Sequence, residues 1–351
     1  MSFIPVFHLI CGAGSLIKKG QFLILLILLQ CMGVVLALDS NMVDFPSYMS
    51  HYEKTPALID VVNDFNLLVV VYGEPLFVGF QVLCKSIGLN YIGFRILFFS
   101  LMMLLNTLLF YKFKPYIFFI LLWYLAFFYH NDGNIMRSAF SSTLVMLSVV
   151  YLNQKNLMLS FFCFVLAVLM HYFALFLLFF YTWYFLNFKR KAVIFFLLFS
   201  FLLGLLGISK FILLFIVGLG GEDMLILDKI YRYSLDEGRQ GAGVLRFITV
   251  LPILIISVAI IKYRIVIRSK SDNAWLMVFT IAVSSLFFFS DFRLMSDRLF
   301  TLLGFSGSVL LILTFRAFDK STLVVYQFFW ISLLVLFTGF KYRNYTFGGG
   351  G

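Results

Sequence analysis

Long apolar runs separated by short polar segments recur along the whole chain. Because about 20 residues of helix cross the hydrocarbon core of a bilayer, such runs predict membrane-spanning helices, several of them short. The pattern therefore predicts an all-α, polytopic integral membrane protein with about eleven transmembrane helices. A short or re-entrant helix over 76–88 would add to this set. The expected spans are 21–38, 91–110, 115–130, 138–152, 157–170, 172–187, 192–216, 244–261, 273–290, 299–315 and 321–340.

Composition supports the same fold class. Of the 351 residues, 62% are hydrophobic and only 12% are charged, which excludes a soluble globular protein. The net charge of +11 is scattered between apolar runs, so it does not indicate nucleic-acid binding. We expect one transmembrane domain over 1–347 with outer loops at 39–75 and 219–243, both too short for a nucleotide-binding domain. The terminal glycines, 348–351, form a linker-like tail.

The distribution of basic residues predicts the orientation. With the N-terminus inside, the cytoplasmic side carries fourteen Lys and Arg against two Asp, and the outer side carries thirteen against fourteen acidic residues. Cytoplasmic segments of membrane proteins are enriched in Lys and Arg, so this split indicates the direction of insertion. We therefore expect a multi-pass protein of the bacterial inner membrane whose outer face meets the periplasm.

Four arginines stand at the outer start of helices that run inward. A cation opposes the macrodipole at a helix N-terminus, and such a break of a local rule often marks function. An anion held between the guanidinium groups would explain the placement. The alternative is that these side chains reach lipid headgroups or pair with Glu74, Asp132, Asp291 or Asp297. The four residues are Arg95, Arg137, Arg246 and Arg298.

Two of the candidate residues have unusual positions. The run 138–152 after Arg137 is short for a crossing, which places Arg137 below the outer interface, where an ionisable group is costly. His171 interrupts a long apolar stretch that must fold as a tight hairpin, with the imidazole near the outer turn. We expect an outward-facing cavity there, in which His171 is a base or a phosphate contact; the alternative is a packing role.

Common catalytic signatures are absent from the sequence. It has no GxSxG, HExxH or Walker loop, no CxxC pair and no outward DxD, so we expect neither a metal nor a cofactor. The remaining chemistry is a set of charged residues assigned to the outer face together with His171. The set comprises Arg95, Arg137, Arg232, Arg239, Arg246, Arg293, Arg298, Glu74, Asp132, Asp236, Glu237, Asp291 and Asp297.

Three motifs in order resemble the Wzy-type O-antigen and capsular polysaccharide polymerases, in particular their EpsG-like group. They are Glu74-Pro-Leu-Phe, Asn134-Ile-Met-Arg137-Ser-Ala and Leu169-Met-His171-Tyr-Phe. The resemblance implies a glycosyltransferase that moves a growing glycan from undecaprenyl diphosphate to a new lipid-linked repeat unit at the periplasmic face. It also implies a Wzz-type chain-length regulator as a partner, and no nucleotide sugar.

These observations lead to a specific hypothesis about the site. Arg137, Arg298 and Arg246 would bind the substrate diphosphates, with Arg95 and Arg239 as further candidates. His171, Glu74 or Asp132 would deprotonate the acceptor hydroxyl, and His171 is favoured because imidazole titrates near neutrality. An O-antigen ligase and a non-enzymatic lipid-linked oligosaccharide flippase or transporter remain alternatives.

Overall fold

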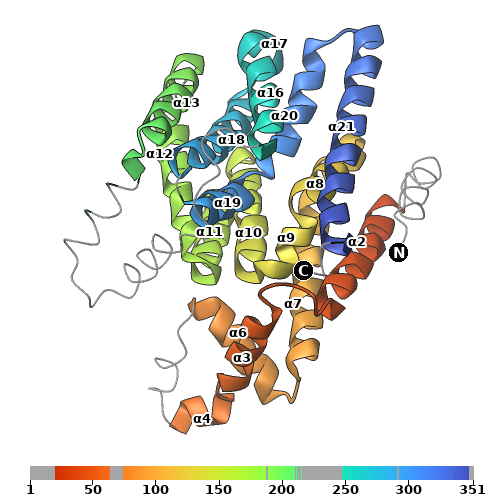
Figure 1. Cartoon of the computed structure of the whole chain (residues 1–351), viewed down its shortest axis with the longest axis vertical. Coiled ribbons are helices and arrows are strands. Elements are labelled where there is room, and N and C mark those ends of the chain that lie inside the picture. The colour runs from red at the N-terminus through yellow and green to blue at the C-terminus, as the bar shows by residue number, and fades with distance from the viewer. Residues whose placement is uncertain are drawn as a thin grey trace. The chain divides into compact units, whose positions relative to one another are not determined.

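The computed structural model describes residues 20–63, 74–186, 189–209, 211, 215, 247–290 and 292–347. Within these ranges the regular elements are α-helices and short 3-10 helices (Figure 1). The all-helical fold expected from the sequence is therefore observed. The loop 219–243 and the terminal glycines lie outside the described residues.

Four described helices are long and apolar enough to cross a membrane. They are Gln21–Leu38, Tyr91–Tyr111, Lys270–Phe288 and Lys320–Gly339. A fifth span is formed if Met295–Leu303 and Ser306–Ala317, which are bent by 57° at a short break, are one crossing. The other expected spans correspond to shorter helices or lie partly outside the described residues. A polytopic membrane protein is thus supported, while the number of eleven spans and the outward-facing cavity stay predictions.

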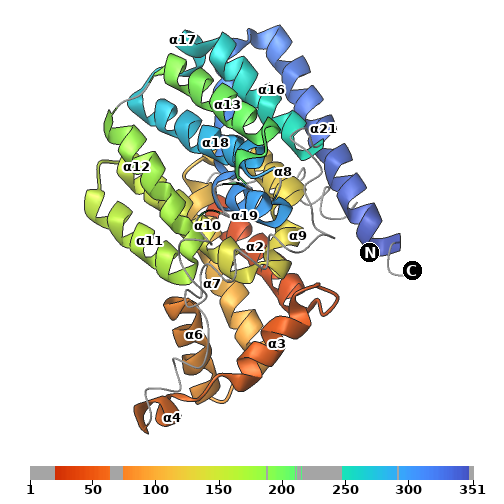
Figure 2. The same cartoon turned by 60° about the vertical axis from the view of Figure 1, so that its left-hand side comes forward.

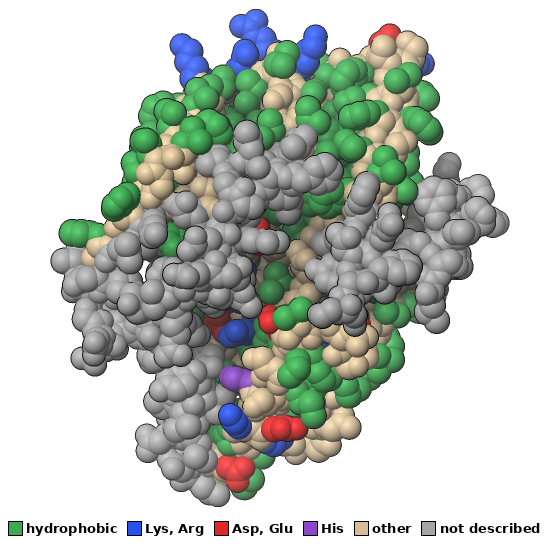
Figure 3. Space-filling model, in the orientation of Figure 1, with side chains coloured by type: hydrophobic (Ala, Val, Ile, Leu, Met, Phe, Trp, Pro, Cys, Tyr) green, Lys and Arg blue, Asp and Glu red, His purple; other side chains and the backbone are tan. Residues whose placement is uncertain are grey.

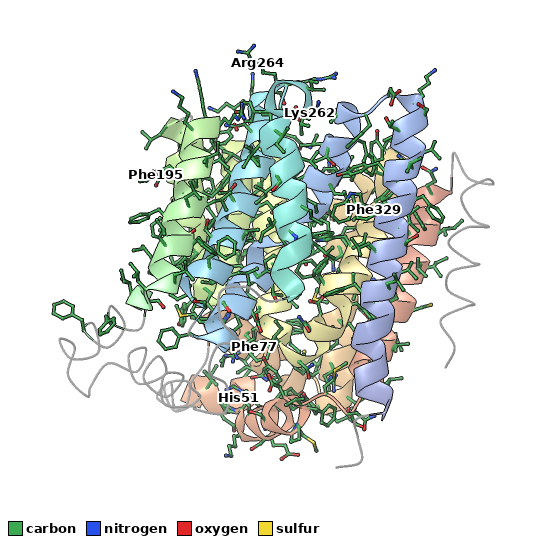
Figure 4. The ribbon with its side chains drawn as sticks, turned by 45° about the horizontal axis from the view of Figure 1, so that its top comes forward. His51, Phe77, Phe195, Lys262, Arg264 and Phe329 are labelled. Carbon is green, nitrogen blue, oxygen red and sulfur yellow. The ribbon has the colours of Figure 1, made fainter. Side chains whose placement is uncertain are left out.

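Large apolar side chains on the outside of the spanning helices have the character of lipid-facing groups. Leu23 of the first span is 59% exposed, and Val325 and Phe328 of the last span are each 69% exposed. Figure 4 shows Phe195 and Phe329 projecting away from their helices. Exposed apolar surface on this scale marks contact with a nonpolar environment in an intact protein.

The chain divides into two compact units. Unit 1 comprises 1–144, 169–172 and 334–351, and unit 2 comprises 145–168 and 173–333. Three of the described α-helices are shared, since α10 (Met136–Asn153) begins in unit 1, and α11 (Leu157–Met170) and α21 (Lys320–Phe347) end there. The short helix η2 (Tyr172–Phe176) begins at the last residue of the 169–172 segment of unit 1 and continues into unit 2. The described elements that lie in unit 1 or begin there are α2 (Gln21–Leu38), α3 (Phe45–Lys54), α4 (Leu58–Asn63), α6 (Pro75–Ser86), α7 (Tyr91–Tyr111), η1 (Lys114–Tyr116), α8 (Ile117–Phe127), α9 (Tyr129–Asn134) and α10 (Met136–Asn153).

The core of unit 1 is built on the close pairing of α2 with α7. A Cβ added at Gly33 would lie 2.9 Å from Met103 Cγ, so only glycine allows this approach of the two backbones. Phe94 and Phe98 of α7 are fully buried, and Phe77 of α6 packs edge-on against them at 5.9 and 5.7 Å between ring centroids. This aromatic cluster fixes α6 on α7.

The short helix α6 begins where the sequence predicts. Glu74 is its N-cap residue with an extended backbone, and Pro75 follows at the first helical position, where its missing N–H and fixed φ are tolerated. Gly88, with φ +80°, lies just after the helix, in the left-handed conformation that commonly ends one. Glu74 is thereby held at a defined helix start.

The two arms of the hairpin expected around His171 lie largely in unit 2, whereas residues 169–172 at its turn belong to unit 1. Ser160 of α11 and Tyr181 of α12 are hydrogen-bonded at 2.7 Å through their hydroxyl groups, and Phe164 packs on Tyr181. The helix breaks at His171, between Met170 and Tyr172, and α11 and α12 lie side by side in Figures 1 and 2. The described elements that lie at least partly in unit 2, besides α10, are α11 (Leu157–Met170), η2 (Tyr172–Phe176), α12 (Leu177–Leu186), α13 (Arg190–Leu205), α16 (Phe247–Ile261), α17 (Tyr263–Val266), α18 (Lys270–Phe288), α19 (Arg293–Leu303), α20 (Ser306–Thr314), η4 (Phe315–Ala317) and α21 (Lys320–Phe347).

Helix α18 is the centre of unit 2 and is buried along nearly its whole length. Its start is fixed by a capping box between Ser269 and Asp272, and the Asp272 carboxylate also accepts a hydrogen bond from Arg316 at 2.7 Å. Exposed Lys and Arg side chains, including Lys262 and Arg264, gather at this end of unit 2 (Figures 3 and 4). The sequence assigns them to one side of the membrane; that this side is cytoplasmic stays a prediction.

Candidate functional site

Glu74, Arg137 and His171 come together in unit 1 although they are far apart in the sequence. Glu74 Oε2 forms an ion pair with an Nη of Arg137, and Glu74 Oε1 accepts a hydrogen bond of 2.8 Å from His171 Nδ1. The carboxylate is only 4% exposed, and His171 is 6% exposed. One buried carboxylate therefore bridges the two residues that the sequence singled out for their depth.

The local structure explains how each residue reaches the site. Glu74 precedes the first turn of α6, Arg137 is the second residue of α10, and His171 occupies the break between α11 and η2. All three stand at ends of helices, where backbone geometry changes and side chains project from a rigid neighbour. The anion that offsets the unfavourable placement of Arg137 at a helix N-terminus is thus the carboxylate of Glu74.

Ionisation of Glu74 is favoured by its partners. Burial raises its pKa, but the hydrogen bond from His171 and the positive charge of Arg137 outweigh this effect and lower the pKa to about 2. The group is a carboxylate at any physiological pH. The carboxylate accepts the hydrogen bond from His171. Because its pKa is so low, Glu74 is itself a poor general base.

The hydrogen bond also sets the tautomer of His171. An ionised carboxylate can only accept, so Nδ1 of the neutral imidazole carries the proton and Nε2 carries the lone pair. A carboxylate that orients an imidazole in this way is the arrangement that prepares a histidine for general-base catalysis. In the neutral ring, Nε2 is thus the nitrogen that is able to accept a proton.

Two aromatic rings flank the guanidinium of Arg137. Its Cζ lies 5.7 Å from the ring centroid of Tyr48 and 5.6 Å from that of Phe77. The side chain keeps 22% of its surface exposed. A guanidinium has five N–H donors, so the ion pair with Glu74 leaves others to contact a ligand.

Two further candidate residues have partners in unit 1. Arg95 is 1% exposed and donates hydrogen bonds to the carbonyl oxygens of Leu36, at 2.6 Å, and Asp39, at 3.1 Å. Its guanidinium thus caps the C-terminal end of α2, where a cation is favourable. Asp132 is 4% exposed and accepts a hydrogen bond of 2.6 Å from the Tyr124 hydroxyl.

The remaining candidates are not brought to this group by the described structure. Arg298 is a half-buried residue of α19 in unit 2. Arg239 and Arg246 lie outside the described residues, as do Arg232, Asp236, Glu237 and Asp291. Among the residues that the structure describes, no three His, Cys, Asp or Glu side chains form a group that could hold a metal ion.

Helix α3 is part of this region, although its sequence pattern was not recognised as a site. Tyr48 contacts Arg137, and His51 Nδ1 lies 3.0 Å from Gln81 Oε1 of α6. The stretch was interpreted as a polar outer loop. The available signal was the spacing of Tyr48, His51, Tyr52 and Thr55, which places all four on one face of a helix.

The fold and the buried polar group define a multi-pass helical membrane protein with ionisable side chains at helix ends. The sequence matches the EpsG family over residues 22–349, and the chain belongs to that family, which is associated with exopolysaccharide biosynthesis. No curated protein and no solved structure is significantly similar to the chain.

Proposed function

We propose that this protein is a polysaccharide polymerase that acts on lipid-diphosphate-linked substrates at the outer face of the bacterial inner membrane. The donor would be the growing glycan on undecaprenyl diphosphate, and the acceptor would be a new lipid-linked repeat unit. Membership of the EpsG family supports a role in polysaccharide synthesis. The observation that carries the enzymatic assignment is the buried bridge from Glu74 to His171 and Arg137.

In this mechanism His171 is the general base. Its Nε2 takes the proton of the acceptor hydroxyl as the hydroxyl oxygen forms a bond to the anomeric carbon of the donor sugar. The bond between that carbon and the diphosphate oxygen breaks, and undecaprenyl diphosphate leaves with the electron pair. Glu74 holds the imidazole in the required tautomer and stabilises the imidazolium that forms.

Arg137 would stabilise the departing diphosphate through the N–H groups that do not contact Glu74. Its positive charge is already balanced by Glu74, so a ligand with two or more negative charges needs further cations. Arg298 and Arg246 stay candidates for this role. A Wzz-type regulator would set the chain length, and neither a metal nor a nucleotide sugar would take part.

Deletion of the gene tests the proposal in cells. We expect surface polysaccharide to shorten to single repeat units. The intact gene should restore the long chains, whereas His171→Ala at equal membrane abundance should not. Full-length chains after deletion would refute the polymerase assignment. Lipid-linked repeats that accumulate only on the cytoplasmic side would indicate a flippase, and normal polymer that is not joined to its final acceptor would indicate a ligase.

A further inference from the structure

A polar seam runs between α3 and α6, starting at Arg137. Tyr48, His51 and Thr55 lie on the face of α3 that meets α6, because their spacing of three and seven residues repeats on one side of a helix. His51 Nδ1 lies 3.0 Å from Gln81 Oε1, and Thr55 Oγ1 lies 3.3 Å from the same oxygen. Figure 4 shows His51 and Phe77 close together at this end of the protein.

The ring of Tyr48 lies beside the guanidinium of Arg137, with 5.7 Å between its centroid and Cζ. A phenol hydroxyl both donates and accepts hydrogen bonds, so Tyr48 is able to contact a sugar oxygen. Tyr48 is half-buried, and its ring packs edge-on against Phe77 at 5.9 Å between centroids. The residue thus combines a fixed aromatic surface with a hydroxyl donor beside the candidate catalytic group.

Buried polar atoms at this seam have unfilled hydrogen-bonding capacity. Gln81 is fully buried, yet its Nε2 has no partner among the described residues, and Arg137 Nε likewise has none there. Exchanging the amide nitrogen and oxygen of Gln81 does not change this, because the oxygen would then be the amide atom without a hydrogen-bond partner. Both atoms are enclosed by the protein, so the surface that a ligand is able to reach at this seam is formed by Tyr48 and His51, which are half-buried.

The seam has a cation at each end and uncharged side chains between them. Arg137 stands at one end, whereas Tyr48, Thr55 and Gln81 carry no charge, and the Lys85 ammonium at the far end is bound to the carbonyl oxygens of Glu53 and Thr55 at 2.7 and 2.5 Å. From Tyr48 to Thr55 the helix rises roughly 10 Å, a length comparable with a short oligosaccharide. A ligand with an anionic group next to a neutral polyol matches this order, with the anionic group at Arg137 and the polyol along the uncharged side chains.

We propose that the α3 face of Tyr48 and His51 binds the sugar attached to the lipid diphosphate. Tyr48 would donate to a sugar oxygen and present its ring to the apolar face of the pyranose, while Arg137 contacts the neighbouring phosphate. This inference rests on the proposed function, since it takes the lipid-linked saccharide as substrate. It adds a saccharide-binding role for a helix that the reaction itself does not require.

Binding measurements with two lipids distinguish the contact to the sugar from the contact to the diphosphate. The purified full-length protein in nanodiscs is titrated with undecaprenyl diphosphate and with the undecaprenyl-diphosphate-linked saccharide extracted from cells that lack the gene. Tyr48→Phe should raise the Kd for the saccharide lipid roughly fivefold, the effect of one hydrogen bond, and leave the Kd for the sugar-free lipid unchanged. Tyr48→Leu, which also removes the ring, should weaken saccharide binding further.

Tyr52→Phe is the matched control. It removes a hydroxyl from the same helix, but this hydroxyl donates to Leu89 O at 2.7 Å and not to the seam. We expect both Kd values to stay at the wild-type level. If Tyr48→Phe weakens both lipids equally, Tyr48 acts only through Arg137 and the sugar site is refuted. Unchanged binding in both Tyr48 variants also refutes it. If the wild-type protein binds neither lipid, the proposed function itself fails.

Discussion

Replacing Glu74 with glutamine changes one atom of the bridging group and tests its role directly. A glutamine oxygen can still accept from Arg137, but its amide must then donate to His171 Nδ1. This places the imidazole proton on Nε2 and removes the lone pair that would accept the substrate proton. In a serine protease the corresponding carboxylate-to-amide exchange lowers kcat by about 10⁴. We expect Glu74→Gln to lower kcat by about 10³–10⁴ with a much smaller effect on KM.

The assay follows product formation from lipid-linked saccharide by the purified protein, separated by chain length. Glu53→Gln is the matched control, because Glu53 lies on the exposed side of α3. It should keep wild-type kinetics. The loss of charge at the buried Glu74 should also lower the free energy of unfolding by about 1–3 kcal/mol, visible as a lower Tm. A folded Glu74→Gln protein with a kcat within threefold of wild type would refute the assignment of His171 as a carboxylate-oriented base.

Three further outcomes are expected. Arg137→Lys keeps the charge but loses the planar fork, so activity should fall by about 10²-fold at unchanged abundance; near-normal turnover would remove Arg137 from the diphosphate contact. Arg95→Lys should lower Tm, because the carbonyl oxygens of Leu36 and Asp39 lose donors, while the folded fraction keeps its specific activity; a selective loss of activity would contradict a capping role. The depressed pKa of Glu74 gives stability that is present above about pH 4.5 and lost as the pH falls toward about 2; Glu74→Gln should flatten Tm against pH in this window, and an unaltered acid dependence would contradict the bridge.

Local pattern predicted the parts of the fold that depend on neighbours in sequence. Apolar runs located the spanning helices, Glu74 and Pro75 marked the start of α6, and the length of one apolar stretch placed a turn at His171. The association of Glu74 with Arg137 and His171 depends on packing across 63 and 97 residues. Spacing along the chain carries no information on such contacts, so Glu74 was named as one of several alternative partners of the arginines and as one of three candidate bases, and was not placed beside both Arg137 and His171.

Arg95 shows why similar residues could not be separated beforehand. It lies in the second turn of α7, whereas Arg137 is the second residue of α10, and both were expected at the outer face and as phosphate-binding residues. The two guanidinium groups contact different kinds of oxygen atom. Arg95 donates to backbone carbonyl oxygens at the end of α2, whereas Arg137 pairs with a carboxylate. Phosphate, carboxylate and carbonyl oxygens all satisfy a guanidinium. Only the packing of α2 against α7 decides which one is within reach.

Reaction stoichiometry decides whether the protein is a polymerase that uses His171 as its base. Purified wild-type protein is incubated with lipid-linked repeats, and glycosidic bonds formed and undecaprenyl diphosphate released are both counted by mass spectrometry. We expect one molecule of undecaprenyl diphosphate for each new bond, with neither product from His171→Ala. Wild-type protein that moves or binds the lipid without forming a bond, or His171→Ala that forms bonds at the normal rate, would contradict this expectation.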